Sequence, residues 1–262
     1  MAKSKISVEE NDYVLMIALN RPEKRNAFDF EMYQDLSLAY GELHQNPNLH
    51  CGLLFARGDH FTAGLELDEW APLLSKGRFP DLPKNSIDPL GLNEENKLCK
   101  PMVMALQGLC LTIGLELLLA TDIRVAASDT RFAQLEIKRG LYPVGGATVR
   151  LMQEVGWGNA MRYLLTGDEI TAKEAFRIGI VQELTEPGKQ LDRALEIATT
   201  ISKQAPLGIK ATLTSARIAR TQGENHAIAR LLPDLIPIMQ SEDFKEGVQS
   251  FIERREAKFK GF

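Results

Sequence analysis

The sequence feature that most constrains the fold is a series of short apolar runs, each bounded by turn-forming residues such as Gly, Pro or Asn. They lie at 13–19, 51–56, 103–106, 123–126 and 180–184. Runs of this length are typical of buried strands. The second and third are followed by a glycine-containing turn and then by a helical pattern. Strands that alternate with helices in this way predict an α/β fold with parallel strands.

Helical patterns fill much of the remaining chain. Asp29 is placed to cap a helix that ends near Gln45, and the sequence from Thr171 to Glu174 has the form of a capping box. From Leu191 onward the pattern is helical, with segments expected near 191–204, 206–220, 224–239 and 241–253. We therefore expect a core over residues 1–204 and a helical C-terminal region over 205–262, which serves assembly or covers the active site.

Composition narrows the class of protein. The 262 residues are 44% hydrophobic and 25% charged, as in ordinary folded proteins, and the net charge of −4 argues against a dedicated nucleic-acid binder. There is no long apolar stretch of the kind that spans a membrane. Three cysteines without CxxC spacing and a polar N-terminus without signal character predict a cytoplasmic protein in a reducing compartment.

Two glycine-containing turns are candidate anion sites. Residues 61–67 and 108–117 each follow a predicted strand and precede a helical pattern. Backbone amides at the start of a helix lack intrahelical partners and favour negative charge. Such turns are common in α/β proteins, but two of them together could polarise one carbonyl oxygen.

Two glutamates are candidate catalytic acids. Glu116 lies inside the apolar stretch 113–120, where an unpartnered carboxylate would be costly to bury, so a task or a partner is expected. Glu136 precedes a Gly/Pro-rich turn and is either the second member of a carboxylate pair or a surface acid beside Lys138 and Arg139. Sequence spacing leaves both interpretations of Glu136 open.

Other chemistries have little support. The four histidines lack metal-ligand spacing, and we expect no metal site. The sequence has no nucleophile-elbow, phosphate-loop or dinucleotide-binding motif. The segment 72–93 is rich in Pro, Gly, Ser and Asp. It is long enough for a lid or a mobile substrate-binding loop, although an uninvolved surface excursion fits equally well.

Along nearly its full length, the chain resembles the enoyl-CoA hydratase/isomerase (crotonase) family. The resemblance rests on an early loop, two glycine-containing motifs, the Glu136 region and a C-terminal signature. These are residues 19–28, 61–67, 108–117, 132–151, 243–248 and 259–261. It implies a spiral of ββα units with a helical C-terminal region, assembled into homotrimers or into hexamers of two trimers.

The resemblance also implies the site. It places the oxyanion-hole amides on Leu65 and Ile113 and the two acids of the hydratase branch on Glu116 and Glu136, twenty residues apart. The coenzyme A contacts implied by the resemblance are Arg25, the Ala27 main chain, Ala63, Phe259 and Lys260. Coenzyme A would enter as part of the thioester substrate, with no permanently bound cofactor.

The expected reaction is the addition of water across the 2,3 double bond of an enoyl-CoA thioester. The alternatives are an enoyl-CoA double-bond isomerase that uses a single acid, and an acyl-CoA-binding homologue without turnover. The chain departs from the family pattern at Thr112-Ile113-Gly114, where many hydratases have three glycines, and at Asp68, where the family has a lysine. A bulky residue at the second oxyanion position narrows the expected acyl pocket.

Overall fold

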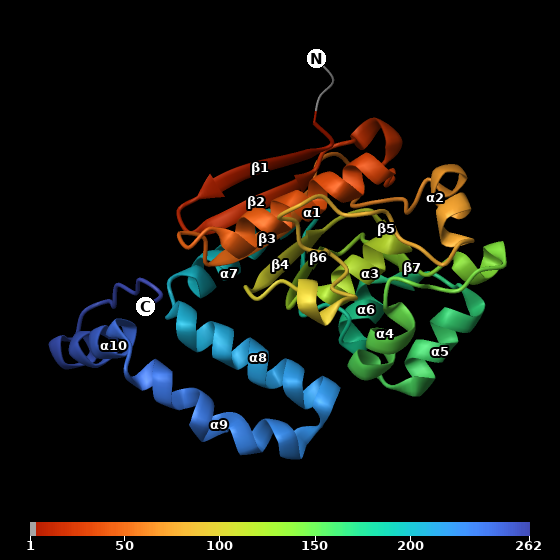
Figure 1. The fold of residues 1–262 in the computed structure, drawn as a ribbon. Helices are drawn as coiled ribbons and strands as arrows, with labels where there is room; N and C mark the ends of the chain where they lie inside the picture. The colour runs from red at the N-terminus through yellow and green to blue at the C-terminus, as the bar shows by residue number, and fades with distance from the viewer. Residues whose placement is uncertain (1–3) are drawn as a thin grey trace.

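The computed structural model describes residues 4–262, so the first three residues of the expected core lie outside the described part. Its main element is a six-stranded sheet with the order β1-β2-β3-β4-β6-β9 (Figure 1). β1 and β2 pair antiparallel, and the other neighbours pair parallel. The strands are β1 (Ile6–Asn11), β2 (Val14–Leu19), β3 (Cys51–Ala56), β4 (Met102–Leu106), β6 (Ile123–Ala127) and β9 (Glu183–Thr185).

A second, three-stranded sheet repeats the order of the first. It contains β5 (Leu109–Leu111), β7 (Arg131–Ala133) and β8 (Ile170–Thr171). β5 follows β4 and β7 follows β6, so two strands of the main sheet are each followed by a short strand of the second sheet. Thr62, which follows β3, forms an isolated parallel bridge with Cys110 in β5. Successive repeats therefore stack side by side, which brings the turns between strand and helix onto one edge.

The main sheet is covered on both faces. In β3, Leu54 belongs to the larger core with α1 and α3, whereas Leu53 and Phe55 pack with Ala194 of α7. Strand side chains alternate between faces, so these apolar strands are buried on both sides. The helices of the core are α1 (Phe30–Gln45), α2 (Leu67–Leu74), α3 (Ile113–Ala120), α4 (Ala147–Val155), α5 (Trp157–Thr166), α6 (Ala172–Ile178) and α7 (Gln190–Ser202).

The last three helices form a separate region beside the sheet (Figure 1). α8 (Pro206–Gln222) and α9 (Glu224–Met239) form a hairpin, and α10 (Glu242–Glu253) follows. The expected boundary at 204/205 falls in the short connection between α7 and α8. α8 buries none of its side chains and α9 buries Ala227. Among the described residues, helices are too short or too polar to cross a membrane.

The structure confirms several local predictions. The Asp29 carboxylate accepts a hydrogen bond from the Met32 amide at 2.9 Å, and α1 ends at Gln45 as expected. The Thr171 hydroxyl caps α6 by accepting from the Glu174 amide at 3.3 Å. The strands expected at 51–56, 103–106 and 123–126 are present, as are the four C-terminal helical segments.

Other local predictions were wrong or incomplete. The strand expected at 180–184 begins only at Glu183, because Ile180 and Val181 are buried in the turn that ends α6. β1 was not predicted, since most of its residues are polar and it is an edge strand. Short strands of two or three residues also escape periodicity, which needs longer windows.

Parts of the segment 72–93 belong to a helix or are packed into the core. Its start belongs to α2, and residues 86–88 and 90 are buried. The Asp88 carboxylate anchors this part, because it accepts from the Tyr33 hydroxyl at 2.7 Å and from the Leu90 and Leu92 amides at 3.0 and 2.9 Å. The second half of the segment is thus part of the core wall.

Candidate active site

Two glycine-containing turns lie against each other at the edge where the repeats stack. The Thr62 amide donates to the Leu109 carbonyl at 2.9 Å, and the Leu111 amide donates to the Thr62 carbonyl at 3.1 Å. Beyond this pairing, a Cβ atom on Gly64 would lie only 2.4 Å from the Thr112 hydroxyl oxygen. Gly64 has a φ of 111°, which also favours glycine at this position.

Each turn leaves one amide available. The Thr62 hydroxyl accepts from the Gly64 amide, and the Phe28 carbonyl accepts from the Glu66 amide. Between them, the Leu65 amide has no hydrogen-bond partner among residues 4–262. Ile113 begins α3, so its amide has no intrahelical acceptor. The Leu65 and Ile113 amides are thus unpaired donors on adjacent segments, and their role as an oxyanion hole stays a prediction.

Thr112 adopts a strained backbone conformation that sets up the second turn. Its φ is 49°, in the left-handed region that residues other than glycine rarely adopt. The Thr112 amide donates to the Ala133 carbonyl at 2.9 Å, which ties the turn to β7. The bulky Ile113 side chain is buried in the core, with 2% of it exposed. The β-branched residue therefore fills core volume.

The early loop packs along the first of these turns. The Ala63 amide donates to the Arg25 carbonyl at 2.9 Å, and the Phe28 amide donates to the Gly64 carbonyl at 2.8 Å. The Arg25 side chain is exposed, and Ala27 and Ala63 are half-buried. Arg25, Ala27 and Ala63 thus lie together beside the first turn, and their contact with coenzyme A stays a prediction.

Glu116 lies in the first turn of α3 and is almost fully buried, with 5% of the residue exposed. Its carboxylate accepts a hydrogen bond from the Ala147 amide at 3.2 Å, from the N-terminus of α4. Burial, helped by the charge of Glu136, raises the pKa of Glu116 to about 7 against the lowering effect of the Ala147 and Gly145 amides. The acid thus titrates near neutrality.

Glu136 begins the short 3₁₀ helix Glu136–Arg139 and is half-buried. Burial raises its pKa to about 7. The charge of Glu136 raises the pKa of Glu116. The Glu136 carboxylate contacts the buried Gln134 side chain, whereas Lys138 and Arg139 are exposed, so the interpretation of Glu136 as a surface acid is wrong.

Gln134 is a functional candidate that the sequence reasoning missed. It is 1% exposed, and its side-chain amide nitrogen, in the orientation that satisfies its partners, lies 3.1 and 3.0 Å from the two Glu136 oxygens. The same nitrogen lies 3.3 Å from the Thr112 carbonyl. Gln134 therefore links the second acid to the turn that carries the Ile113 amide. The signal available in the sequence was a glutamine among apolar residues, two positions before Glu136.

Phe259 and Lys260 are not brought to this site within one chain. The Lys260 amide donates to the Asp243 carboxylate at 2.6 Å, and Phe259 packs near Gly247. Both lie beside α10, at the opposite end of the molecule from α2 (Figure 1). A role for these two residues at a site like this one requires a second copy of the chain.

Three acids near the early loop also approach each other. Carboxylate oxygens of Asp29, Glu66 and Glu69 lie within 4.8 Å of one another. Arg21 neutralises part of this charge through Asp29 at 3.3 Å and Glu66 at 2.9 Å, and Glu69 accepts from the Phe30 amide. These acids hold the early loop against α1 and α2.

Comparison with known proteins gives a consistent result. The family model described as enoyl-CoA hydratase/isomerase matches residues 9–261. An enoyl-CoA hydratase of Mycobacterium tuberculosis is 35% identical over 96% of this chain and 95% of its own length. A delta(3,5)-delta(2,4)-dienoyl-CoA isomerase of Dictyostelium discoideum is 28% identical over 97% of the chain and 91% of its own length.

The fold is equally well matched. A crystal structure of a probable enoyl-CoA hydratase/isomerase from Mycobacterium abscessus superposes with a TM-score of 0.95 and 44% identity. The match covers 98% of this chain and 99% of that one. The spiral of ββα units followed by helices is therefore the crotonase fold.

Proposed function

This chain belongs to the enoyl-CoA hydratase/isomerase family, and on that premise we propose that it adds water across the 2,3 double bond of an enoyl-CoA thioester. The observation that carries the proposal is a pair of interacting carboxylates, Glu116 and Glu136, each with a pKa of about 7. Hydration needs one group that removes a proton from water and another that delivers a proton to the α-carbon. At neutral pH such a pair holds one of its two protons on average.

The two available amides would bind the thioester oxygen. In the proposed mechanism, the Leu65 and Ile113 amides donate to this oxygen and stabilise the enolate-like charge that develops as water attacks the β-carbon. The donors are fixed by the backbone pairing of the two turns, so little reorganisation is needed at the moment of reaction. This is the oxyanion hole that the resemblance implies.

The two acids would hold the water between them. One carboxylate, ionised, acts as general base, and the other, protonated, acts as general acid. The hydrogen bonds from Gln134 to Glu136 and from Ala147 to Glu116 fix where each carboxylate points.

The binding of coenzyme A is proposed at the mouth of the site. Arg25, Ala27 and Ala63 lie together there, and the exposed Arg25 guanidinium suits a phosphate. The Ala27 amide already donates to the Lys24 carbonyl, and the Ala27 carbonyl oxygen accepts one hydrogen bond from Arg21. The Ala27 carbonyl oxygen has a second lone pair, which can accept a hydrogen bond from coenzyme A. Coenzyme A would enter with the substrate, and no cofactor would be bound permanently.

We also propose that the protein assembles as a homotrimer or as two trimers. The apolar side chains of α9 that point to solvent support this, since a large apolar surface on a helix usually has a partner. Assembly would bring Phe259 and Lys260 of one copy to the coenzyme A of another. The three free cysteines support a cytoplasmic location, where thiols stay reduced.

The test is hydration of crotonyl-CoA, followed by the loss of enoyl absorbance. Glu116→Gln and Glu136→Gln should each lower kcat by roughly 10²- to 10⁴-fold, the usual contribution of general acid-base catalysis, and should bind acyl-CoA nearly as before. Unchanged turnover in both variants would refute the two-acid mechanism. Absence of turnover in the unaltered protein with bound acyl-CoA would support the non-catalytic alternative.

One observation supports the isomerase alternative: the relatives include an enzyme named as a dienoyl-CoA isomerase. Isomerisation of a 3-enoyl-CoA moves a proton and needs no water. A Glu136→Gln variant that lost hydration but converted 3-hexenoyl-CoA at the original rate would assign Glu116 as the single acid of an isomerase. Loss of both activities supports the hydratase.

A further inference from the structure

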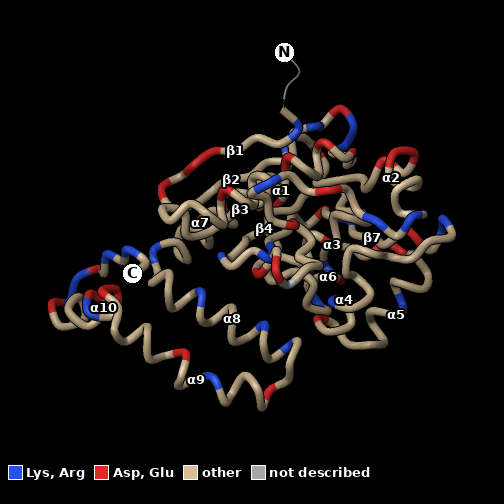
Figure 2. The backbone as a smooth tube through the Cα atoms, viewed as in Figure 1, with Lys and Arg blue, Asp and Glu red and all other residues tan. Residues whose placement is uncertain are grey.

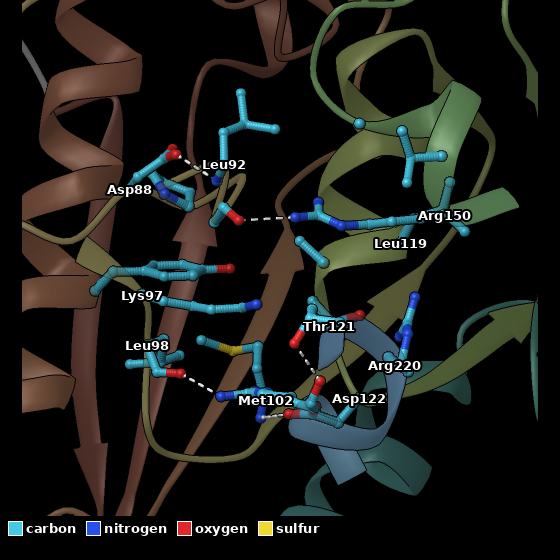
Figure 3. Close-up of a pocket in the computed structure, with 18 of the residues that line it drawn as sticks. Asp88, Leu92, Lys97, Leu98, Met102, Leu119, Thr121, Asp122, Arg150 and Arg220 are labelled. Atoms are coloured by element: carbon cyan, nitrogen blue, oxygen red, sulfur yellow. Dashed lines mark hydrogen bonds and ion pairs between the residues drawn. The ribbon is translucent and has the colours of Figure 1, made fainter. Parts of the chain in front are cut away.

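A cavity of about 280 Å³ lies between the anchored segment 88–98, the end of α3, α4 and α8 (Figure 3). Apolar side chains form part of its wall, including Leu92, Leu119 and Val149. Ligand pockets usually measure about 300–1,000 Å³, so this one suits a small group rather than a whole coenzyme A.

The charge of the cavity wall is predominantly positive. Five basic side chains and two acidic ones line it, and Arg220 also pairs with Glu154 outside the wall at 3.5 Å. The basic ones are Lys97, Lys100, Arg150, Arg217 and Arg220. In Figure 3, Lys97 and Arg150 extend from opposite walls, and Arg220 projects from α8. α8 contains basic residues but no acidic one (Figure 2).

The two acids of the wall are already engaged. Asp88 accepts from the Tyr33 hydroxyl and from two backbone amides. Asp122 accepts from the Met102 amide at 2.9 Å and pairs with Arg217 at 3.4 Å. Burial, together with the charge of Lys210, lowers the pKa of Lys100. Keeping this side chain charged in the wall therefore costs free energy. A bound anion would reduce that cost.

Tyr40 provides an independent observation. It lines the cavity and is 3% exposed, and its hydroxyl has no hydrogen-bond partner among residues 4–262. Buried hydroxyl groups are normally satisfied, and an unpaired one costs roughly 1–3 kcal/mol. A phenol has a donor that suits a carboxylate oxygen. The unpaired hydroxyl therefore indicates a polar occupant.

The cavity adjoins the proposed catalytic acid. Gly146 and Arg150 line it, and the next residue after Gly146, Ala147, donates its amide to Glu116. The charge of Arg150 lowers the pKa of Glu116. The charge of Glu116 in turn raises the pKa of Tyr33, whose hydroxyl donates to Asp88. The cavity is thus separated from Glu116 by the start of α4.

We propose that this cavity binds a carboxylate group, through the Tyr40 hydroxyl and the surrounding basic side chains. The carboxylate has two possible sources: the far end of an acyl chain whose thioester sits in the oxyanion hole, or a free dicarboxylate. The first source rests on the proposed function, and the second does not.

The first arm of the experiment compares two substrates of equal chain length, 2,3-dehydroadipyl-CoA and 2-hexenoyl-CoA. If the carboxylate belongs to the substrate, kcat/KM is about tenfold or more higher for the dehydroadipyl thioester, the gain expected from one charge-assisted hydrogen bond. Tyr40→Phe, which removes only a hydroxyl without a partner, and Arg220→Gln should each lower this ratio. Arg193→Gln removes the same charge from α7 on the opposite face of the sheet and should leave the ratio unchanged.

The second arm measures adipate binding to the unaltered protein by calorimetry. Adipate binding that weakens severalfold in Tyr40→Phe, with a substrate ratio near one, assigns the site to a free dicarboxylate. A ratio near one together with no adipate binding at about 10 mM overturns the proposal. So does any preference or binding that neither Tyr40→Phe nor Arg220→Gln alters. If crotonyl-CoA is not hydrated but adipate binds in a Tyr40-dependent way, the proposed function fails and the carboxylate site stands.

Discussion

The helix that carries Glu116 and the helices that end the chain use similar apolar residues in opposite ways. In α3, every residue from Ile113 to Leu119 is buried. In α9, Ala227 is buried, whereas six large apolar side chains are exposed: Ile228, Leu231, Leu232, Leu235, Ile236 and Met239. Leu232 is 74% exposed, and Phe251 of α10 is 85% exposed.

The difference shows where each region finds its stability. The neighbours of α3 come from its own chain, so one copy provides the acids and amides of the proposed site. Phe259 and Lys260 are proposed to come from another copy. The apolar surface of α9 and α10 has no such neighbours among the described residues of one chain. Site chemistry and assembly should therefore respond to different substitutions.

The largest expected effect comes from crowding the buried acid. In Gly145→Ala, the added Cβ would lie 2.4 Å from a Glu116 carboxylate oxygen and 2.7 Å from its carbon, so the acid must move. We expect a loss of kcat of about 10²-fold or more, since a displacement of about 1 Å at a reacting group can cost that much. Crotonyl-CoA hydration measures it.

Gly158→Ala is the matched control, because a Cβ there meets nothing within 4 Å. It should keep full activity and the same oligomeric mass. Full activity in Gly145→Ala as well would mean that the position of Glu116 is not critical.

The next effect is the pH dependence of the rate. Burial raises the pKa of both acids to about 7, and the proposed reaction needs one ionised and one protonated. As pH falls below 7 the base is lost, and as pH rises above 7 the acid is lost. We expect kcat/KM for crotonyl-CoA to be bell-shaped and to fall about tenfold for each pH unit well away from the optimum on either side. A flat profile from pH 5 to 9 would contradict a shared proton.

The apolar surface of α9 can be tested without touching the site. Leu232→Glu places a charge in the proposed interface and should dissociate the assembly, measured as molar mass by light scattering. Asn225→Glu adds the same charge to an exposed polar position of α9 and should leave the mass unchanged. Because Leu232 is exposed in one chain, the stability of the separated copy should change by less than about 0.5 kcal/mol. An unchanged mass for Leu232→Glu would place the interface elsewhere.

The smallest effect concerns stability. The folded pKa of Glu116 is raised above its unfolded value of 4.5, so folding is disfavoured as pH rises from 4.5 through about 7 and the penalty is complete above that. Glu116→Gln removes this charge. We expect its Tm to exceed that of the unaltered protein by a few degrees at pH 8 and by less at pH 5. An equal difference at both pH values would show that Glu116 carries no buried charge.

Much of the site was predictable from the sequence because its parts are local. The strand, glycine turn and helix start at 61–67 and 108–117 are each specified by neighbouring residues, and a glutamate in an apolar helix is visible in the sequence itself. The pairing of Glu116 with Glu136 was different, since the residues around Glu136 alone favoured a surface role for it beside Lys138.

The sequence by itself determined the α/β class, the C-terminal helices, the two glycine turns and Glu116 as a candidate acid, because each depends on periodicity or on adjacent residues. The amides of Leu65 and Ile113 and the role of Glu136 came from the family resemblance. The tertiary structure alone decided that the two turns touch, that Gln134 links Glu136 to Thr112, and that Tyr40 faces a basic cavity assembled from α1, α3, α4 and α8. These features depend on contacts between residues far apart in the chain, and their burial sets both the pKa values near 7 and the demand for hydrogen-bond partners.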